Sequence, residues 1–198
     1  MTKKRLIIFV KNPIEGEVKT RLASSLGEKK ALDVYHKLLK ITAGAVEDVN
    51  AERLVSYSGY IEESDDFDEQ RFEKTIQKKG NLGEKMKDAF KSSFENGFNR
   101  TVLIGSDCPE ISKSLIEEAF NKLNKTDSVI GPSDDGGYYL IGLSRFIPEI
   151  FDNVEWSTSS VFSSTIKTLD DVGATYHQLK KLNDIDTESD LNASDLLV

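Results

Sequence analysis

The stretch Thr101-Val102-Leu103-Ile104-Gly105-Ser106-Asp107-Cys108-Pro109 is typical of a strand and the loop that follows it in an α/β sheet. Its first four residues form an apolar run typical of a buried strand, and a short loop that ends at a proline follows. Asp107 is thereby presented at the carboxyl end of a strand. Open α/β sheets bind ligands in the crevice outside these ends, so Asp107 is placed to hold a cation or a polar substrate. A plain turn residue is the alternative interpretation.

Further apolar runs of strand length alternate with helical patterns along the chain. The runs are Leu6–Val10, Leu54–Tyr57, Ser128–Ile130, Tyr138–Leu143 and Thr175–Leu179, and the helical patterns are Ala31–Val49, Gly83–Phe98, Leu115–Leu123 and Thr158–Val172. This alternation predicts an α/β fold with a mostly parallel sheet. The segment before Tyr138 is too short for a helical crossover, so we expect an antiparallel pair there and a mixed sheet overall. We expect a single domain over residues 1–198.

Composition excludes several classes of protein. The chain has 198 residues, is 38% apolar and 30% charged, and carries a net charge of −8. The negative charge argues against general nucleic-acid binding, and the apolar runs are too short for a membrane span or for a signal peptide at the N-terminus. The single cysteine, Cys108, excludes a disulfide framework and fits a cytoplasmic protein. Because no histidine is an evident activating base, we interpret Cys108 as a packing residue.

The first loop, which follows the first predicted strand, is rich in cations. Residues 1–40 hold ten Lys/Arg and four Asp/Glu, whereas the remainder of the chain holds sixteen and thirty. Within this loop stand Lys11, Lys19 and Arg21. A strand-to-helix turn offers free backbone N–H groups, and added cations make phosphate the natural ligand. Ordinary solvated surface charge is the alternative, since neither a Walker loop nor a dinucleotide fingerprint is present.

Two acidic segments and one polar segment complete the set of candidates. In Gly131–Tyr139, paired glycines let a ligand approach the backbone, and Asp134 and Asp135 can serve as a base or bind sugar hydroxyls; a hairpin turn is the alternative. Near the C-terminus, Asp184 and Asp186 are spaced to point the same way and share a cation. Thr187, with Asp190 three residues later, also forms a capping pattern for a last helix. The polar segment Gln77–Met86 suits a base or ribose pocket, or is simply a loop before a helix.

Five motifs in this order resemble a known family. They are Lys11-x-Pro-x-x-Gly-x-Val-Lys-Thr-Arg-Leu22, Gln77-x-x-Gly-Asn-Leu-Gly-x-x-Met86, Gly105-Ser-Asp-Cys-Pro109, Gly131-Pro-x-x-Asp-Gly-Gly-Tyr-Tyr-Leu-Ile-Gly142 and Asp184-Ile-Asp-Thr187. The chain is similar to the glycosyltransferase-like, radical-SAM/selenodomain-associated transferases of the nucleotide-diphospho-sugar transferase superfamily. The resemblance covers about residues 5–191 and implies the GT-A type of Rossmann-like fold, a three-layer sandwich.

The resemblance also implies roles for particular residues. Asp107 stands where GT-A enzymes carry a metal-binding Asp-x-Asp, here reduced to Ser-Asp-Cys, and Asp186 resembles a second metal ligand of cytidylyltransferases, so Mg²⁺ or Mn²⁺ is the expected cofactor. Lys19, Arg21 and Asp135 are the predicted catalytic residues. The predicted substrate-binding residues are Lys11, Gly16, Thr20, Gln77, Gly83, Ser106, Gly136, Gly137 and Tyr138.

The predicted activity is transfer from a nucleotide-activated donor. Glycosyl transfer from a nucleoside-diphosphate sugar to a small-molecule acceptor is the leading hypothesis, because the family is usually assigned that role. Nucleotidylyl transfer with release of pyrophosphate is the alternative, because the Lys-Thr-Arg-Leu motif resembles the phosphate-binding loop of guanylyl- and cytidylyltransferases. A nucleotide-binding module without turnover is the third reading. The sequence leaves the nucleobase, sugar, acceptor and oligomeric state open.

Overall fold

The first strand, β1 (Lys4–Val10), lies in the interior of the sheet, and its residues Leu6, Ile7 and Ile8 are completely buried. In the computed structural model, which describes residues 3–196, β1 pairs in parallel with β2 (Glu52–Tyr57) on one side and β4 (Arg100–Ile104) on the other. Because the chain crosses from one side of β1 to the other, the carboxyl ends of β1 and β4 flank a topological switch point.

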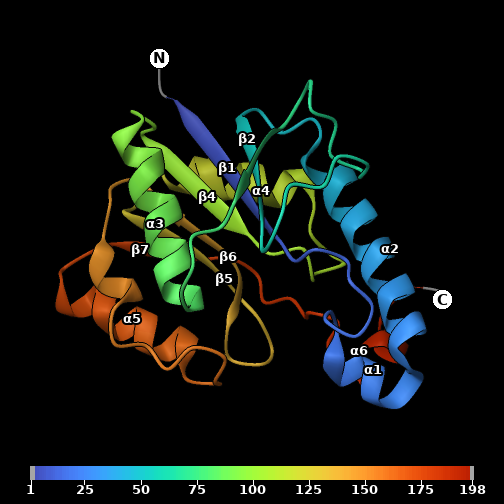
Figure 1. The fold of residues 1–198 in the computed structure, drawn as a ribbon. Coiled ribbons are helices and arrows are strands. Elements are labelled where there is room, and N and C mark those ends of the chain that lie inside the picture. Colours follow the sequence, from blue (N-terminus) through green and yellow to red (C-terminus); the bar gives the residue numbers. More distant parts are fainter. Residues whose placement is uncertain (1–2, 197–198) are drawn as a thin grey trace.

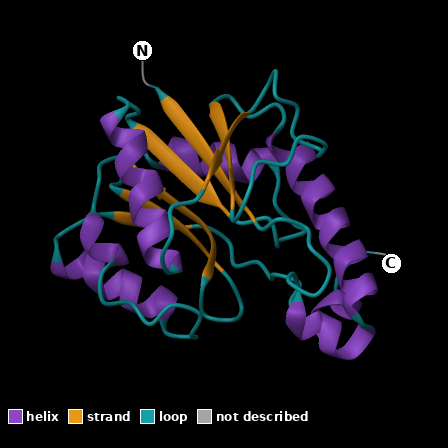
Figure 2. Ribbon diagram, viewed as in Figure 1, coloured by secondary structure: helices purple, strands orange, loops and turns teal. Residues whose placement is uncertain are grey.

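Four more strands extend the sheet on both sides of these three, and Figures 1 and 2 show how the sheet lies among the helices. They are β3 (Glu73–Ile76), β5 (Ser128–Pro132), β6 (Tyr138–Leu143) and β7 (Tyr176–Gln178), and the seven strands lie in the order β3-β2-β1-β4-β6-β5-β7. Strand β6 runs antiparallel to both β4 and β5, whereas the other neighbours are parallel. The predicted α/β fold with a mixed, mostly parallel sheet is therefore confirmed.

Helices cover both faces of the sheet (Figure 2). The helices are α1 (Thr20–Leu26), α2 (Glu28–Val46), α3 (Leu82–Glu95), α4 (Lys113–Lys122), the 3₁₀ helix η1 (Pro148–Phe151), α5 (Val161–Asp171) and α6 (Glu188–Ala193). One core joins α2 and α4 to Leu6, Ile8 and Val10, and another joins α3, η1 and α5 to Ile7. Alternate residues of β1 thus enter opposite cores, as a pleated strand between two helical layers requires.

A third apolar cluster joins the two ends of the chain. Leu22 of α1 and Leu38 of α2 pack with Ile185 and Leu191, which lie next to and within α6. Figure 1 shows α1 and α6 side by side at the lower end of α2. This packing holds the acidic C-terminal segment beside the cationic first loop.

The elements that the sequence did not predict lack ordinary signals. Strand β3 is short and half-polar, and its residues are exposed or only partly buried. Helix α1 begins at Thr20, inside the stretch that we expected to be a loop. Its N-cap residue is Lys19 and no side chain caps the helix, so the usual sequence signal for a helix start is missing. Helix α5 begins at Val161, later than the predicted Thr158.

Candidate functional site

A cleft of about 570 Å³ opens at the carboxyl ends of β1 and β4. The first loop, the loop after β4, the turn between β5 and β6, the start of α3 and the segment before α5 all contribute to its walls. Of the predicted site residues, its lining includes Lys11, Lys19, Thr20, Arg21, Gln77, Ser106, Asp107, Asp135, Gly137, Tyr138 and Asp186. Gly16, Gly83 and Gly136 do not line it.

Lys19 joins the two predicted metal-binding acids. Its Nζ lies 2.8 Å from Oδ1 of Asp107 and 3.1 Å from Oδ1 of Asp186. The side chain of Lys19 is only 4% exposed, whereas each carboxylate is 41% exposed and faces the cleft. Arg21 extends the group, with Nη1 3.8 Å from Oδ2 of Asp186. Residues from the two ends of the chain therefore meet at one point.

Lys19 has an uncommon backbone conformation and a raised pKa. Lys19 adopts a left-handed conformation, with φ 49° and ψ 44°, immediately before α1 begins. Burial alone lowers the pKa of a lysine, but Asp107 and Asp186 outweigh that effect, so the pKa of Lys19 is raised. Lys19 is thus a fixed cation at neutral pH.

The two acidic loops are tied to each other. The backbone N–H of Ile185 donates to the carbonyl oxygen of Asp107 over 3.2 Å. Asp190 accepts from the backbone N–H groups of Asp186 (3.1 Å) and Thr187 (2.7 Å), and it forms a capping box with Thr187 at the start of α6. The capping and cation-binding interpretations of this segment are therefore compatible, because different residues serve each.

Tyr35 of α2, which the sequence did not place in the site, also lines the cleft, as does the predicted Asp184. The buried Tyr35 donates from its hydroxyl to the Lys11 carbonyl and accepts from the Lys11 N–H, both over 3.0 Å. The same hydroxyl lies 3.2 Å from Oγ of Ser106, so Tyr35 connects the first loop to the loop after β4. Asp184 lies beside Asp107, and burial together with that negative neighbour raises its pKa to about 7.

The turn between β5 and β6 is both a hairpin and a wall of the cleft. Oδ1 of Asp135 accepts from Oγ of Ser133 (2.5 Å) and from the N–H of Gly137 (2.9 Å). Across the cleft, the Gln77 amide donates to the carbonyls of Val10 (3.4 Å) and Ser56 (2.8 Å), which fixes its orientation at the ends of β1 and β2. The lysine-bearing first loop lies between these two walls.

Cys108, beside the site, is a packing residue in the structure. It is 4% exposed within the core under α4, and burial raises the pKa of its thiol to about 12. A protonated, enclosed thiol is a poor nucleophile.

The donor set fits a divalent metal that arrives with phosphates. Asp107 and Asp186 converge closely enough to share one ammonium group, and Mg²⁺ accepts one or two carboxylates with waters and phosphate oxygens. Within residues 3–196, no cluster of three or more His, Cys, Asp or Glu side chains could hold a metal ion by itself. The remaining ligands would therefore have to come from substrate and water.

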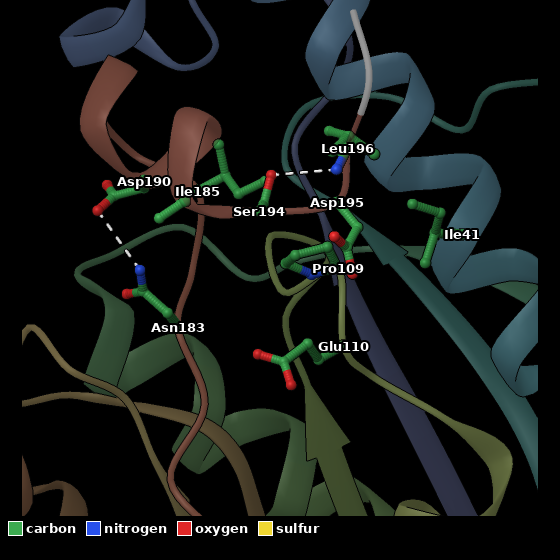
Figure 3. A pocket seen from close by; sticks show the side chains of 10 residues that line it. Ile41, Pro109, Glu110, Asn183, Ile185, Asp190, Ser194, Asp195 and Leu196 are labelled. Carbon is green, nitrogen blue, oxygen red and sulfur yellow. Dashed lines mark hydrogen bonds between the residues drawn. The ribbon is translucent and has the colours of Figure 1, made fainter.

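A second cavity, of about 300 Å³, is lined by residues of α2, of the loop after β4 and of the C-terminal segment (Figure 3). Its walls include Ile41 of α2, Pro109, Glu110, Asn183 and Asp190, and Figure 3 shows the Asn183 amide directed toward the Asp190 carboxylate. None of the predicted site residues lines this cavity, and its acidic side chains oppose a phosphate. The larger cleft is therefore the candidate site.

The fold and cleft define a class, the α/β proteins with the fold of nucleotide-diphospho-sugar transferases. Residues 42–158 match the family described as "Uncharacterized protein conserved in bacteria (DUF2064)". The chain belongs to this family. A comparison with curated proteins gives no match.

Solved structures support the assignment of the fold. A candidate nucleotide-diphospho-sugar transferase from Desulfovibrio desulfuricans G20 superposes with a TM-score of 0.87 at 32% identity, over 94% of this chain and 84% of that one. Two others share the fold at low identity. CMP:2-keto-3-deoxy-manno-octonic acid synthetase in complex with CTP has a TM-score of 0.57 at 9% identity, over 97% and 96% of the two chains. Rv0371c of Mycobacterium tuberculosis H37Rv in complex with manganese has a TM-score of 0.57 at 12% identity, over 97% of each chain.

The described part of the chain contains no helix that is both long and apolar enough to span a membrane.

Proposed function

We propose that this chain is a metal-dependent transferase acting on a nucleotide-activated donor, and that it transfers a glycosyl group from a nucleoside-diphosphate sugar to a small-molecule acceptor. The convergence of Asp107 and Asp186 on Lys19, inside a cleft at the switch point of the sheet, carries this proposal. The 32%-identical structure named as a candidate nucleotide-diphospho-sugar transferase supports it. On the five sequence motifs, we place the chain among the radical-SAM/selenodomain-associated transferases.

The arrangement suits a leaving group that carries several negative charges. Lys11, Lys19 and Arg21 line one wall, where they can neutralise a diphosphate as its bond to the sugar breaks. Asp107 and Asp186 would hold Mg²⁺ or Mn²⁺, which when bound supplies further neutralisation of the phosphates. The manganese complex of Rv0371c supports a divalent ion in this fold.

Asp135, in the turn between β5 and β6, suits the acceptor. In residues 3–196, its hydrogen bonds within the turn engage Oδ1 alone, so Oδ2 can accept the proton of an attacking hydroxyl. In this reaction the acceptor oxygen bonds to the anomeric carbon, the bond from that carbon to the phosphate oxygen breaks, and a nucleoside diphosphate leaves. Gln77, Thr20, Ser106, Gly137 and Tyr138 are the proposed substrate contacts that line the cleft.

Nucleotidylyl transfer is the second candidate, and the buried position of Lys19 favours it. A rigid cation directly beside the metal-binding acids suits the departure of pyrophosphate when an acceptor phosphate attacks the α-phosphate of a nucleoside triphosphate. The CTP complex of a synthetase with this fold supports that chemistry.

The test begins with thermal unfolding of the protein in nucleoside diphosphates, triphosphates and nucleotide sugars, each with and without Mn²⁺. A ligand that binds the folded state raises the unfolding temperature. The best donor is then incubated with candidate acceptors. Release of nucleoside diphosphate supports glycosyl transfer, and release of pyrophosphate supports nucleotidylyl transfer. Metal-dependent binding without turnover would indicate a nucleotide-binding module, and no binding of any nucleotide would refute the proposal.

A further inference from the structure

One end of the cleft is formed by the segment 156–159, between η1 and α5. Trp156, Ser157 and Thr158 of this segment line the cleft. In Figure 1 the loop that leads into α5 passes below the N-terminal end of α3. The sequence motifs did not point to this segment, because it contains none of the five.

Two motif glycines allow segment 156–159 to take its place. A methyl group on Gly83 would lie 2.2 Å from Nε1 of Trp156, and one on Gly136 would lie 2.2 Å from the carbonyl oxygen of Ser159. The carbonyl of Gly136 also accepts from the N–H of Phe162 over 2.8 Å. These glycines lie against neighbouring protein rather than against the cleft. Because they have no side chains, segment 156–159 has room to pack on them.

Several apolar side chains line this part of the cleft. Trp156 meets the ring of Tyr138 edge-on, with centroids 6.5 Å apart, and Leu82 and Met86 of α3 line the same cleft. Leu82 is 44% exposed although it is a large apolar side chain. An exposed apolar surface inside a cleft is suited to the apolar part of a ligand.

One cation of α3 also lines this cleft. Lys85 follows Gly83 by two residues, and within residues 3–196 it forms no ion pair. The neighbouring lysines of the helix differ, since Lys87 binds Asp152 and Lys91 binds Glu95. Lys85 is therefore available to pair with the charge of a ligand.

We propose that Trp156 and Lys85 form the acceptor subsite, and that it takes a small organic anion whose apolar part packs on Trp156 and whose charge pairs with Lys85. This inference rests on the proposed transferase function and names its acceptor class. Lys11, Lys19 and Arg21, which line the same cleft, are left to the donor phosphates.

Fluorescence can test the subsite, because Trp156 is the only tryptophan of the chain. Phenyl phosphate serves as the probe, and inorganic phosphate and phenol are the controls that lack its apolar part or its charge. Each is titrated with and without Mg²⁺ and the nucleotide found in the thermal screen. We expect phenyl phosphate to change Trp156 emission saturably, with an affinity at least about tenfold above either control.

Variants separate the subsite from nonspecific binding. Lys85→Met should weaken phenyl phosphate binding about tenfold, because it removes one charged contact. Lys91→Met, on the same helix but outside the cleft, is the matched control and should bind like the parent. Gly83→Ala should displace Trp156, which would alter its emission before any ligand is added and weaken phenyl phosphate binding.

Equal binding of phenyl phosphate and inorganic phosphate, or unchanged binding in Lys85→Met, would overturn the inference even if nucleotides bind. Conversely, failure of every nucleotide to bind, with Lys85-dependent binding of phenyl phosphate intact, would refute the transferase and its acceptor role while retaining an anion site. Loss of both would overturn both proposals.

Discussion

Replacement of Gly136 by alanine tests whether segment 156–159 is rigidly seated. Gly136 has φ +88°, and an added Cβ would lie 2.2 Å from the Ser159 oxygen and 2.6 Å from its Cα. These are backbone atoms, so they cannot rotate away as the Trp156 side chain can. The left-handed conformation costs an alanine about 1 kcal/mol, and forced overpacking costs about 2 kcal/mol more. We expect the free energy of unfolding to fall by about 3 kcal/mol.

Gly97→Ala is the matched control for this experiment. Gly97 has φ +82°, yet among residues 3–196 nothing lies within 4 Å of the position that an added Cβ would occupy. The substitution therefore carries the conformational cost alone, about 1 kcal/mol. The difference of about 2 kcal/mol between the variants isolates the contact with Ser159.

Equilibrium unfolding in urea, followed by circular dichroism, measures both variants. With a slope of about 2 kcal/mol per molar urea, the contact corresponds to a difference in midpoint of about 1 M. If Gly136→Ala were no less stable than Gly97→Ala, segment 156–159 would be free to move away, and the reasoning that the glycine seats it would be refuted.

Three further substitutions test the centre of the site. Asp107→Asn should fold normally but bind the metal–nucleotide complex at least about tenfold more weakly in calorimetry; unchanged affinity would contradict the metal assignment. Arg21→Ala should lose about tenfold in affinity for a nucleoside diphosphate, and equal affinity would move the phosphates away from the first loop. The pKa of Asp184 is raised to about 7, so the folded state keeps a proton that the unfolded state releases near pH 4. The stability of the metal-free protein should therefore fall as the pH rises from about 4 through 7. Asp184→Asn should flatten that decline in urea titrations at several pH values, and an unchanged decline would exclude Asp184 as its source.

The strand ends were predictable because hydrophobic runs and the topology of α/β sheets act together. Asp107 follows a buried apolar run, and the first loop follows another, so their meeting at one edge could be expected from parallel pairing. The contact between Lys19 and Asp186 could not be predicted in this way. It depends on the packing of α1 against α6, two helices that lie near opposite ends of the sequence.

The roles of Tyr35, Gly83 and Gly136 could not be predicted, because each depends on a contact with a residue distant in the sequence. Tyr35 fits the apolar face of α2 by its spacing, and its role comes from a hydroxyl that reaches the backbone of Lys11. Gly83 and Gly136 signal a close approach, but a sequence does not say whether a ligand or another part of the chain approaches. In the structure, segment 156–159 is what lies against them.

The ion pairs of Lys19 have a consequence for the order in which ligands bind. Lys19 and Arg21 balance Asp107 and Asp186, so the resting site carries no net charge from these four groups. A bare divalent ion would have to displace a buried ammonium from two carboxylates and would gain little. A nucleotide offers phosphates to both cations and releases the carboxylates, so metal and nucleotide should each strengthen the binding of the other.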